Sequence, residues 1–506
     1  MFFPNRRAAL VLVCWMWLLT PALFEVVSTR ALALWCAAGF LFWPLTLCRP
    51  LLLLGMVFLC ALGTVNVLHI GFFGNLADQL FIATALRTNW QEAQEFSGIL
   101  PAPWVMVALL WLLISVMACR VLWVDVKHAA PQARKLAWAG CLVWVVFLIF
   151  VVANRYDTGE VARKLKTIYP MHIVRAWTAQ QQLTEGLFYA PQLPSAEANA
   201  PQVDTLVVVI GESASAQRWS LLGYTGADTN KTLAQVAGLQ VARAMAHGFN
   251  TAAALPYLLT GMTAQDSVAR KAPSFLDIAR QAGYKTFVVS NSRYHSSVED
   301  FYGVTFRRAA DVFLKAGNGE FDAVLTPHLQ NAIADPAPRK LIVLHTYGSH
   351  FQVEERYPKE SAYFQDAYDN SLRYSSDLLA QWIAMLDNAV AGGSTAMMLY
   401  SSDHGVAMPP CADQYRTGSG LSSLEVPLLA WGNAALRTQS PQLLPQFSQA
   451  QRAWPMLSNA TVADFAVAAL GYPEALKQIA PPEVRALTFQ GRSWAELQNL
   501  DACTLQ

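Results

Sequence analysis

The sequence predicts a five-helix transmembrane domain followed by an α/β domain with a mostly parallel central sheet. Of its 506 residues, 54% are hydrophobic and 14% are charged, whereas about 25% of a typical soluble domain is charged. The apolar excess lies in the first 153 residues, and short apolar segments alternate with helical stretches from residue 204 onward. This composition excludes a disordered chain, and a net charge of +1 gives no field that would attract nucleic acid.

Five apolar segments in residues 1–153 approach the roughly 17–25 residues that a helix needs to cross a bilayer. They are Ala8–Phe24, Ala31–Leu47, Leu51–His69, Trp104–Trp123 and Leu136–Val152. A cleaved signal peptide would account for the first segment alone. Buried helices of a soluble protein rarely lack a polar face five times over, so we expect a membrane anchor.

The basic residues near these segments predict the orientation of the anchor. They lie before the first segment, between the second and third, and between the fourth and fifth: Arg6, Arg7, Arg49, Arg120, Lys127, Arg134 and Lys135. Lysine and arginine are enriched on the cytoplasmic side of membrane proteins. Five crossings then place the chain beyond about residue 154 outside the cytoplasm.

The segment of residues 70–100 is too polar to cross the membrane. Thr84, Thr88 and Glu92 follow one another at intervals of four residues, so they share one face of an interfacial helix. On these residues alone, a solvated helix surface is the alternative to a functional face.

The outer part of the chain begins with a connector over residues 154–200 and continues as a domain over residues 201–506. Its expected strands are Thr205–Ile210, Lys285–Ser290, Lys340–Thr346, Ala396–Ser401 and Val426–Trp431. Nearly continuous apolar strands separated by helical stretches are typical of a parallel sheet that is covered on both faces.

Polar residues follow three of these strands. Glu212 comes after the first, His345 and His350 come at and after the end of the third, and Asp403 and His404 follow the fourth. Ligands of open α/β sheets bind beyond the carboxyl ends of the strands. Carboxylates with imidazoles suit a divalent transition metal, zinc foremost, because calcium prefers more oxygen ligands. Taken singly, each residue also fits a helix cap or a surface histidine.

Thr251 lies where a turn gives way to an expected helix, within the segment His247–Pro256. The amino-terminal end of a helix can hold a phosphate through its backbone N–H groups. A hydroxyl beside zinc becomes a nucleophile at neutral pH. The alternative is that Thr251 is only the N-cap of the helix.

Several stretches together resemble the bacterial phosphoethanolamine transferases, which belong to the alkaline phosphatase/sulfatase superfamily. The stretches are Gly211–Tyr224 with Asp228–Asn230, Gly248–Pro256, His345–His350, Tyr368–Tyr374 and Ser402–Gly405. The resemblance covers nearly the whole chain, including the five-span anchor. The Gly-Glu-Ser form with Arg218 is nearer to the lipopolysaccharide-core-modifying branch than to the lipid A branch.

The resemblance implies a sulfatase-like and alkaline-phosphatase-like fold and one zinc ion, held by Glu212, Thr251, Asp403 and His404. It also implies that Thr251 attacks phosphatidylethanolamine, releases diacylglycerol and carries the phosphoethanolamine to an acceptor. His350 matches a histidine near the transferred phosphate and is assigned an acid/base role.

Substrate contacts are also implied by the resemblance. Thr84, Thr88 and Glu92 fall where the family lines the lipid headgroup site, and His345 is expected on the substrate side. The family's second zinc-binding histidine has no counterpart, because no histidine follows His404. Arg416 falls near that place, so we expect it to hold a phosphate oxygen and expect no second zinc ion.

The implied partners are phosphatidylethanolamine as donor, lipopolysaccharide or another envelope glycan as acceptor, and membrane lipid, with no nucleic acid. The chain is expected to be a monomeric, multi-pass protein of the bacterial inner membrane with its catalytic domain in the periplasm. Alternatives are a phosphoglycerol transferase, a phosphodiesterase, a periplasmic glucan phosphoethanolamine transferase, or a non-catalytic envelope scaffold. Cys411 and Cys503 are the two cysteines of the outer domain, and whether they pair is left open.

Overall fold

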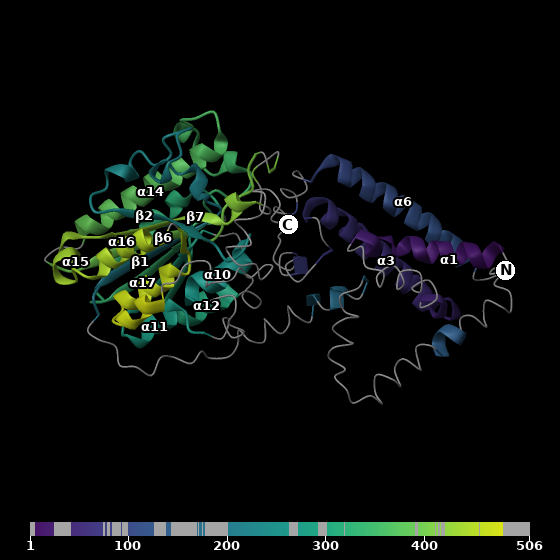
Figure 1. Cartoon of the computed structure of the whole chain (residues 1–506). Coiled ribbons are helices and arrows are strands. Elements are labelled where there is room, and N and C mark those ends of the chain that lie inside the picture. The colour runs from purple at the N-terminus through teal and green to yellow at the C-terminus, as the bar shows by residue number, and fades with distance from the viewer. Residues whose placement is uncertain are drawn as a thin grey trace. The chain divides into compact units, whose positions relative to one another are not determined.

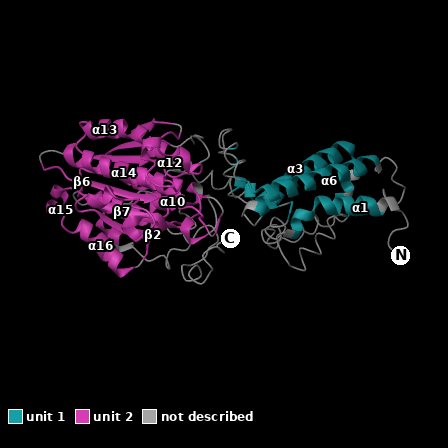
Figure 2. Ribbon diagram, turned by 90° about the horizontal axis from the view of Figure 1, so that it is seen from above, with its two compact units in different colours: residues 1–182 teal, residues 183–506 magenta. Residues whose placement is uncertain are grey.

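The computed structural model divides the chain into two compact units, Met1–Gln182 and Leu183–Gln506 (Figure 2). It describes residues 6–24, 42–73, 76–77, 81–82, 85, 93, 100–125, 138–142, 169–170, 172–174, 176–177, 201–262, 272–291, 301–317, 319–389, 393–409, 411–412, 415, 420–454 and 456–478. The division falls inside the stretch 154–200 that we expect to be a connector, and the bounds of that connector stay a prediction.

The first unit is helical. Its described elements are α1 (Arg6–Leu18), α3 (Arg49–Phe73), α6 (Ala102–Asp125) and the 3₁₀ helices η1 (Thr20–Phe24) and η2 (Trp43–Leu47). Among the described residues, two stretches are long and apolar enough to cross a membrane, Arg49–Gly71 in α3 and Ala102–Val124 in α6. They correspond to the third and fourth expected spans. The second and fifth expected spans lie largely outside the described residues, so the count of five stays a prediction.

Helices α3 and α6 pack closely and still present apolar side chains outward. A Cβ atom at Gly63 would lie 2.0 Å from the ring of Trp111, so the close approach requires glycine there. Leu54 and Met106 are each 66% exposed. An apolar outer surface is what a helix facing lipid requires. Thr84, Thr88 and Glu92 lie outside the described residues.

The second unit contains an eight-stranded sheet in the order β4-β3-β5-β1-β6-β7-β2-β8. Its strands are β1 (Thr205–Gly211), β2 (Gln240–Met245), β3 (Lys285–Ser290), β4 (Val312–Lys315), β5 (Lys340–His345), β6 (Ala396–Ser402), β7 (Glu425–Gly432) and β8 (Leu457–Ser458). Every pairing is parallel except those of β7 with β6 and β2. The mostly parallel α/β prediction is confirmed, and the five expected strands match within one residue at each end.

Helices cover both faces of the sheet (Figure 1). One face packs against residues of α10 (Thr251–Thr260), α11 (Phe275–Gln281), α12 (Phe301–Ala309), α15 (Ala434–Gln439), α16 (Leu443–Ala453) and α17 (Thr461–Ala469). The other face packs against α13 (Thr326–Ala334) and α14 (Ala367–Ala389). Strand β1 contributes Val208 to the first core and Val209 to the second. Burial on both faces explains its continuous apolar sequence.

The register of the central strands brings their carboxyl ends to one edge. Ile210 of β1 pairs with His345 of β5, and Gly211 pairs with Ser402 of β6. The residues that immediately follow β1 and β6 therefore leave the sheet side by side, and these are Glu212 and Asp403.

Candidate active site

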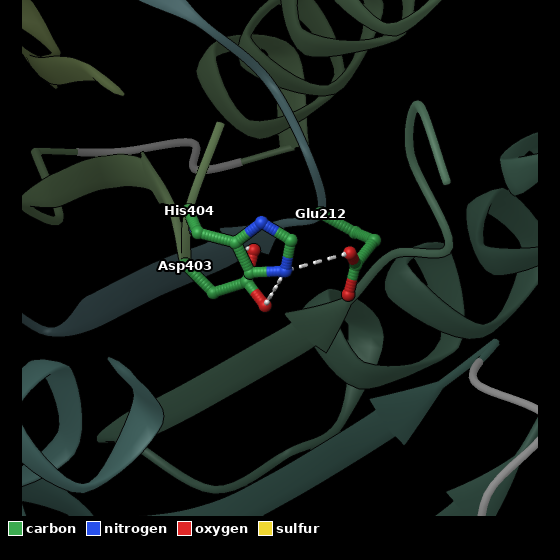
Figure 3. Close-up of side chains that lie close together, drawn as sticks. All are labelled: Glu212, Asp403 and His404. Carbon is green, nitrogen blue, oxygen red and sulfur yellow. Dashed lines mark hydrogen bonds and ion pairs between the residues drawn. The ribbon is translucent and has the colours of Figure 1, made fainter. Parts of the chain in front are cut away.

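Glu212, Asp403 and His404 form a compact buried cluster at this edge (Figure 3). Nε2 of His404 lies 3.3 Å from Oε1 of Glu212 and 3.6 Å from Oδ2 of Asp403. One ligand atom of each side chain lies within 4.8 Å of the others. The arrangement offers one nitrogen and two oxygen donors, a set that suits zinc.

The two turns that carry this cluster are joined by hydrogen bonds. The N–H of Asp403 donates to the carbonyl of Gly211 at 3.0 Å, which continues the ladder between β1 and β6. The N–H of Ser213 donates to Oδ1 of Asp403 at 3.3 Å, and the N–H of Ala214 donates to the hydroxyl of Ser402 at 2.9 Å. The adjacent parallel strands β1 and β6 thus fix the side chains of Glu212, Asp403 and His404 relative to one another.

The ring of His404 is oriented by its neighbour in sequence. Nδ1 lies 2.7 Å from the carbonyl oxygen of Gly405. A carbonyl only accepts hydrogen bonds, so Nδ1 carries a hydrogen, and loss of the other ring proton would present the Nε2 lone pair to the cluster. A Cβ at residue 405 would lie 2.1 Å from the carbonyl of Ser422, so only glycine permits this close approach.

The electrostatics of the cluster favour a bound cation. Burial and the neighbouring charge of Glu212 raise the pKa of Asp403 to about 7. Burial opposes charge on His404, but the carboxylates of Asp403 and Glu212 outweigh it and raise its pKa to about 9. Oδ2 of Asp403 is buried and has no hydrogen-bond partner in the described part of the chain. A buried acceptor without a donor is costly, and a divalent cation would satisfy it.

Thr251 lies beside the cluster as the first residue of α10. The N-cap is Asn250, whose side-chain oxygen accepts from the N–H of Ala253 at 3.0 Å. The alternative that Thr251 is itself the cap is therefore wrong. Its hydroxyl instead donates to Oε2 of Glu212 at 3.0 Å, so the structure brings Thr251 together with the three other expected ligands.

The two histidines of the β5 region occupy different environments. His350 is half-buried in the loop after β5, where its ring stacks on Tyr347 with centroids 4.6 Å apart. Burial raises the pKa of the nearby Glu212 carboxyl, but the charges of His404 and, to a smaller extent, His350 help to outweigh burial and lower that pKa overall. His345 is the last residue of β5 and is 2% exposed, with Nδ1 3.1 Å from the hydroxyl of Ser290. The structure thus places His345 inside the fold and not on an open substrate surface.

The sequence reasoning missed several supporting residues. Asp322 is buried, and its carboxylate accepts from the N–H groups of Tyr347 and Gly348, each at 2.8 Å, in the loop that carries His350. No local pattern marks Asp322, because its partners lie 25 and 26 residues away. Ser213 stands inside the Gly-Glu-Ser stretch, so it could have been noticed as an immediate neighbour of Glu212.

Some expected residues fall outside the described part of the chain. Arg416 and Cys503 lie there, as do the three residues of the expected headgroup site. Cys411 is described and is disulfide-bonded.

A model of the sulfatase family matches residues 204–471. The putative transferase YhbX of Escherichia coli (strain K12) is 30% identical over 248 residues, which cover 46% of this chain and 44% of YhbX. The chain thus spans less than half the length of that relative. The phosphoethanolamine transferase EptC of the same strain is 22% identical over 472 residues, covering 82% of this chain and 79% of EptC.

Among solved structures, the fold resembles that of an integral membrane protein, the lipooligosaccharide phosphoethanolamine transferase A (EptA) of Neisseria meningitidis. The TM-score is 0.61 at 17% identity, over 92% of this chain and 95% of that one. The resemblance to phosphoethanolamine transferases and their superfamily, first seen in the motifs, is confirmed by these matches.

Proposed function

The chain belongs to the sulfatase family, and we propose that it is a zinc-dependent transferase that moves phosphoethanolamine from phosphatidylethanolamine to an envelope glycan. The observation that carries the proposal is the hydrogen bond from the Thr251 hydroxyl to Glu212 within the buried cluster. It supports a nucleophilic role for this hydroxyl, at the start of α10 and next to side chains that could bind a metal. The names of EptC and EptA supply the transferred group.

In this proposal, Glu212, Thr251, Asp403 and His404 hold one zinc ion. Bound there, the ion would lower the cost of negative charge on the attacking and phosphoryl oxygens. The absence of any histidine after His404 supports a single ion.

The proposed reaction has two steps, which are joined by a covalent intermediate on Thr251. The proton of the Thr251 hydroxyl passes to His350 as Oγ1 forms a bond to phosphorus and the bond from phosphorus to the diacylglycerol oxygen breaks. His350 gives this proton to the released diacylglycerol oxygen. An acceptor hydroxyl then attacks the same phosphorus, the bond to Thr251 breaks, and the acceptor's proton returns to the threonine. His350 transfers these protons, and the first turn of α10 faces the phosphate.

In the proposal, the first unit anchors the chain in the membrane that contains the lipid donor. The two membrane-length helices support an anchor in the bacterial inner membrane with the second unit in the periplasm. Thr84, Thr88 and Glu92 contact the lipid headgroup, Arg416 holds a phosphate oxygen, and the chain acts as a monomer. Its acceptor is lipopolysaccharide or another envelope glycan.

Release of diacylglycerol by the purified full chain tests this function. We expect release from phosphatidylethanolamine, loss of release in Thr251→Ala, and little change in Thr260→Ala. Thr260 is the matched control, because it ends the same helix and its hydroxyl contacts backbone groups there, donating to the carbonyl of Pro256 and accepting from the N–H of Met262. Release from phosphatidylglycerol alone would identify a phosphoglycerol transferase, and equal release by Thr251→Ala would refute the nucleophile.

A further inference from the structure

The turn that presents Glu212 contains an unusual backbone conformation. Ser213 has a φ of 58°, in the left-handed region that residues with a Cβ seldom enter. Such a conformation persists only where the surrounding structure holds it in place.

Three hydrogen bonds hold Ser213. Its N–H donates to Oδ1 of Asp403 at 3.3 Å, and its hydroxyl donates to Oε1 of Glu212 at 2.6 Å. Its carbonyl accepts from the hydroxyl of Tyr368 at 2.7 Å. Ser213 therefore contacts two expected metal ligands on one side and a tyrosine on the other.

Tyr368 bridges the two sides of this turn and is itself held by other contacts. It lies in the first turn of α14 and is fully buried. Besides donating to Ser213, its hydroxyl accepts from the N–H of Ser215 at 2.8 Å, so one oxygen bridges both sides of the turn. The ring stacks on Tyr415 with centroids 4.6 Å apart, and the N–H of Tyr368 donates to Asp366 at 2.9 Å. These contacts fix Tyr368 independently of the turn.

We infer that Tyr368 is a positioning residue for the metal centre, which acts through Ser213 to fix the carboxylates of Glu212 and Asp403. The inference rests on the proposed zinc site. Without the phenol oxygen, the carbonyl of Ser213 and the N–H of Ser215 lose their partner. The strained turn then relaxes and withdraws the Ser213 hydroxyl from Glu212 and the Ser213 N–H from Asp403.

Zinc affinity of the full chain in detergent, measured by competition with a chromogenic chelator, tests this inference. Tyr368→Phe keeps the ring and should weaken zinc binding by about 10–100-fold, the usual effect of losing a group that orients a ligand. Tyr284→Phe is the matched control, because Tyr284 is equally buried but donates to Val203 at the opposite end of the sheet. It should leave the zinc affinity at the wild-type value. Wild-type affinity in Tyr368→Phe would overturn the inference.

A double-substitution cycle separates positioning from a general loss of stability. Ser213→Ala should also weaken zinc binding, and Tyr368→Phe combined with it should lose no more than the larger single effect, because both act through one path. Fully additive losses would overturn the inference. If Tyr368→Phe fails to fold, wild-type affinity in Ser213→Ala alone would overturn it. Absence of zinc from the unsubstituted chain would instead overturn the metal centre and the inference with it.

Discussion

The hydroxyl of Thr251 donates a 3.0 Å hydrogen bond to Oε2 of Glu212, across 39 residues of chain. It joins the amino-terminal end of α10 to the carboxyl end of β1. Because Asn250 caps the helix, the Thr251 hydroxyl is not needed as the N-cap and can interact with the cluster. The relationship links the expected nucleophile to an expected metal ligand.

Zinc binding should release a proton. In the metal-free site the carboxylates raise the pKa of His404 to about 9, despite burial that opposes the charge. The imidazole is therefore protonated at pH 7.5 and must lose its proton to offer Nε2 to a metal. Zinc affinity should rise with pH up to about 9. Titration calorimetry in two buffers of different ionisation enthalpy should show about one proton released, and identical heats would contradict the prediction.

Asp322→Asn should destabilise the loop that carries His350. The substitution replaces one carboxylate oxygen by an NH₂ group that faces an N–H, either that of Tyr347 or that of Gly348. A buried donor without an acceptor costs about 1–3 kcal/mol, so the melting temperature and the transfer rate should both fall. Asp377→Asn is the control, because Asp377 pairs with Arg373 on the surface of α14. A variant as stable as wild type would refute the anchoring role.

His345 should contribute to acid sensitivity. Burial lowers its pKa to about 4, against an unfolded value near 6.5. As the pH falls, the imidazole of His345 is therefore protonated at a higher pH in the unfolded chain than in the folded chain. The contribution to stability that is present above pH 6.5 is lost as the pH falls toward 4. The full loss is about 3 kcal/mol. His345→Gln should show a smaller drop in melting temperature between pH 7 and pH 4.5 than wild type, and an equal drop would contradict this assignment.

The sequence predicted the fold and the cluster where local pattern carried the information. Glu212, Asp403 and His404 follow apolar strands, and parallel strands bring such residues to one edge. Strand β2 was missed because three of its six residues are only half-buried, and β4 and β8 are too short to show a pattern. His345 was assigned to the rim because it ends a strand. His345 is still paired with its neighbouring strands, so its side chain projects from one face of the sheet. There its ring packs edge-on against Phe306 of α12.

The supporting contacts could not be predicted from the sequence. Tyr368 meets the Ser213 turn across 155 residues, and no periodicity encodes such a distance. The left-handed conformation of Ser213 is equally hidden, because serine has no local preference for it.

The chemical state of Thr251 tests the central claim most directly. The full chain is purified from membranes, incubated with phosphatidylethanolamine without acceptor glycan, and digested, and the peptide that contains Thr251 is mapped by mass spectrometry beside a Thr251→Ala control. We predict a phosphoethanolamine adduct on Thr251 that is missing from the control. A phosphoglycerol adduct at Thr251, or a phosphoethanolamine adduct that persists on another residue in Thr251→Ala, would contradict the account.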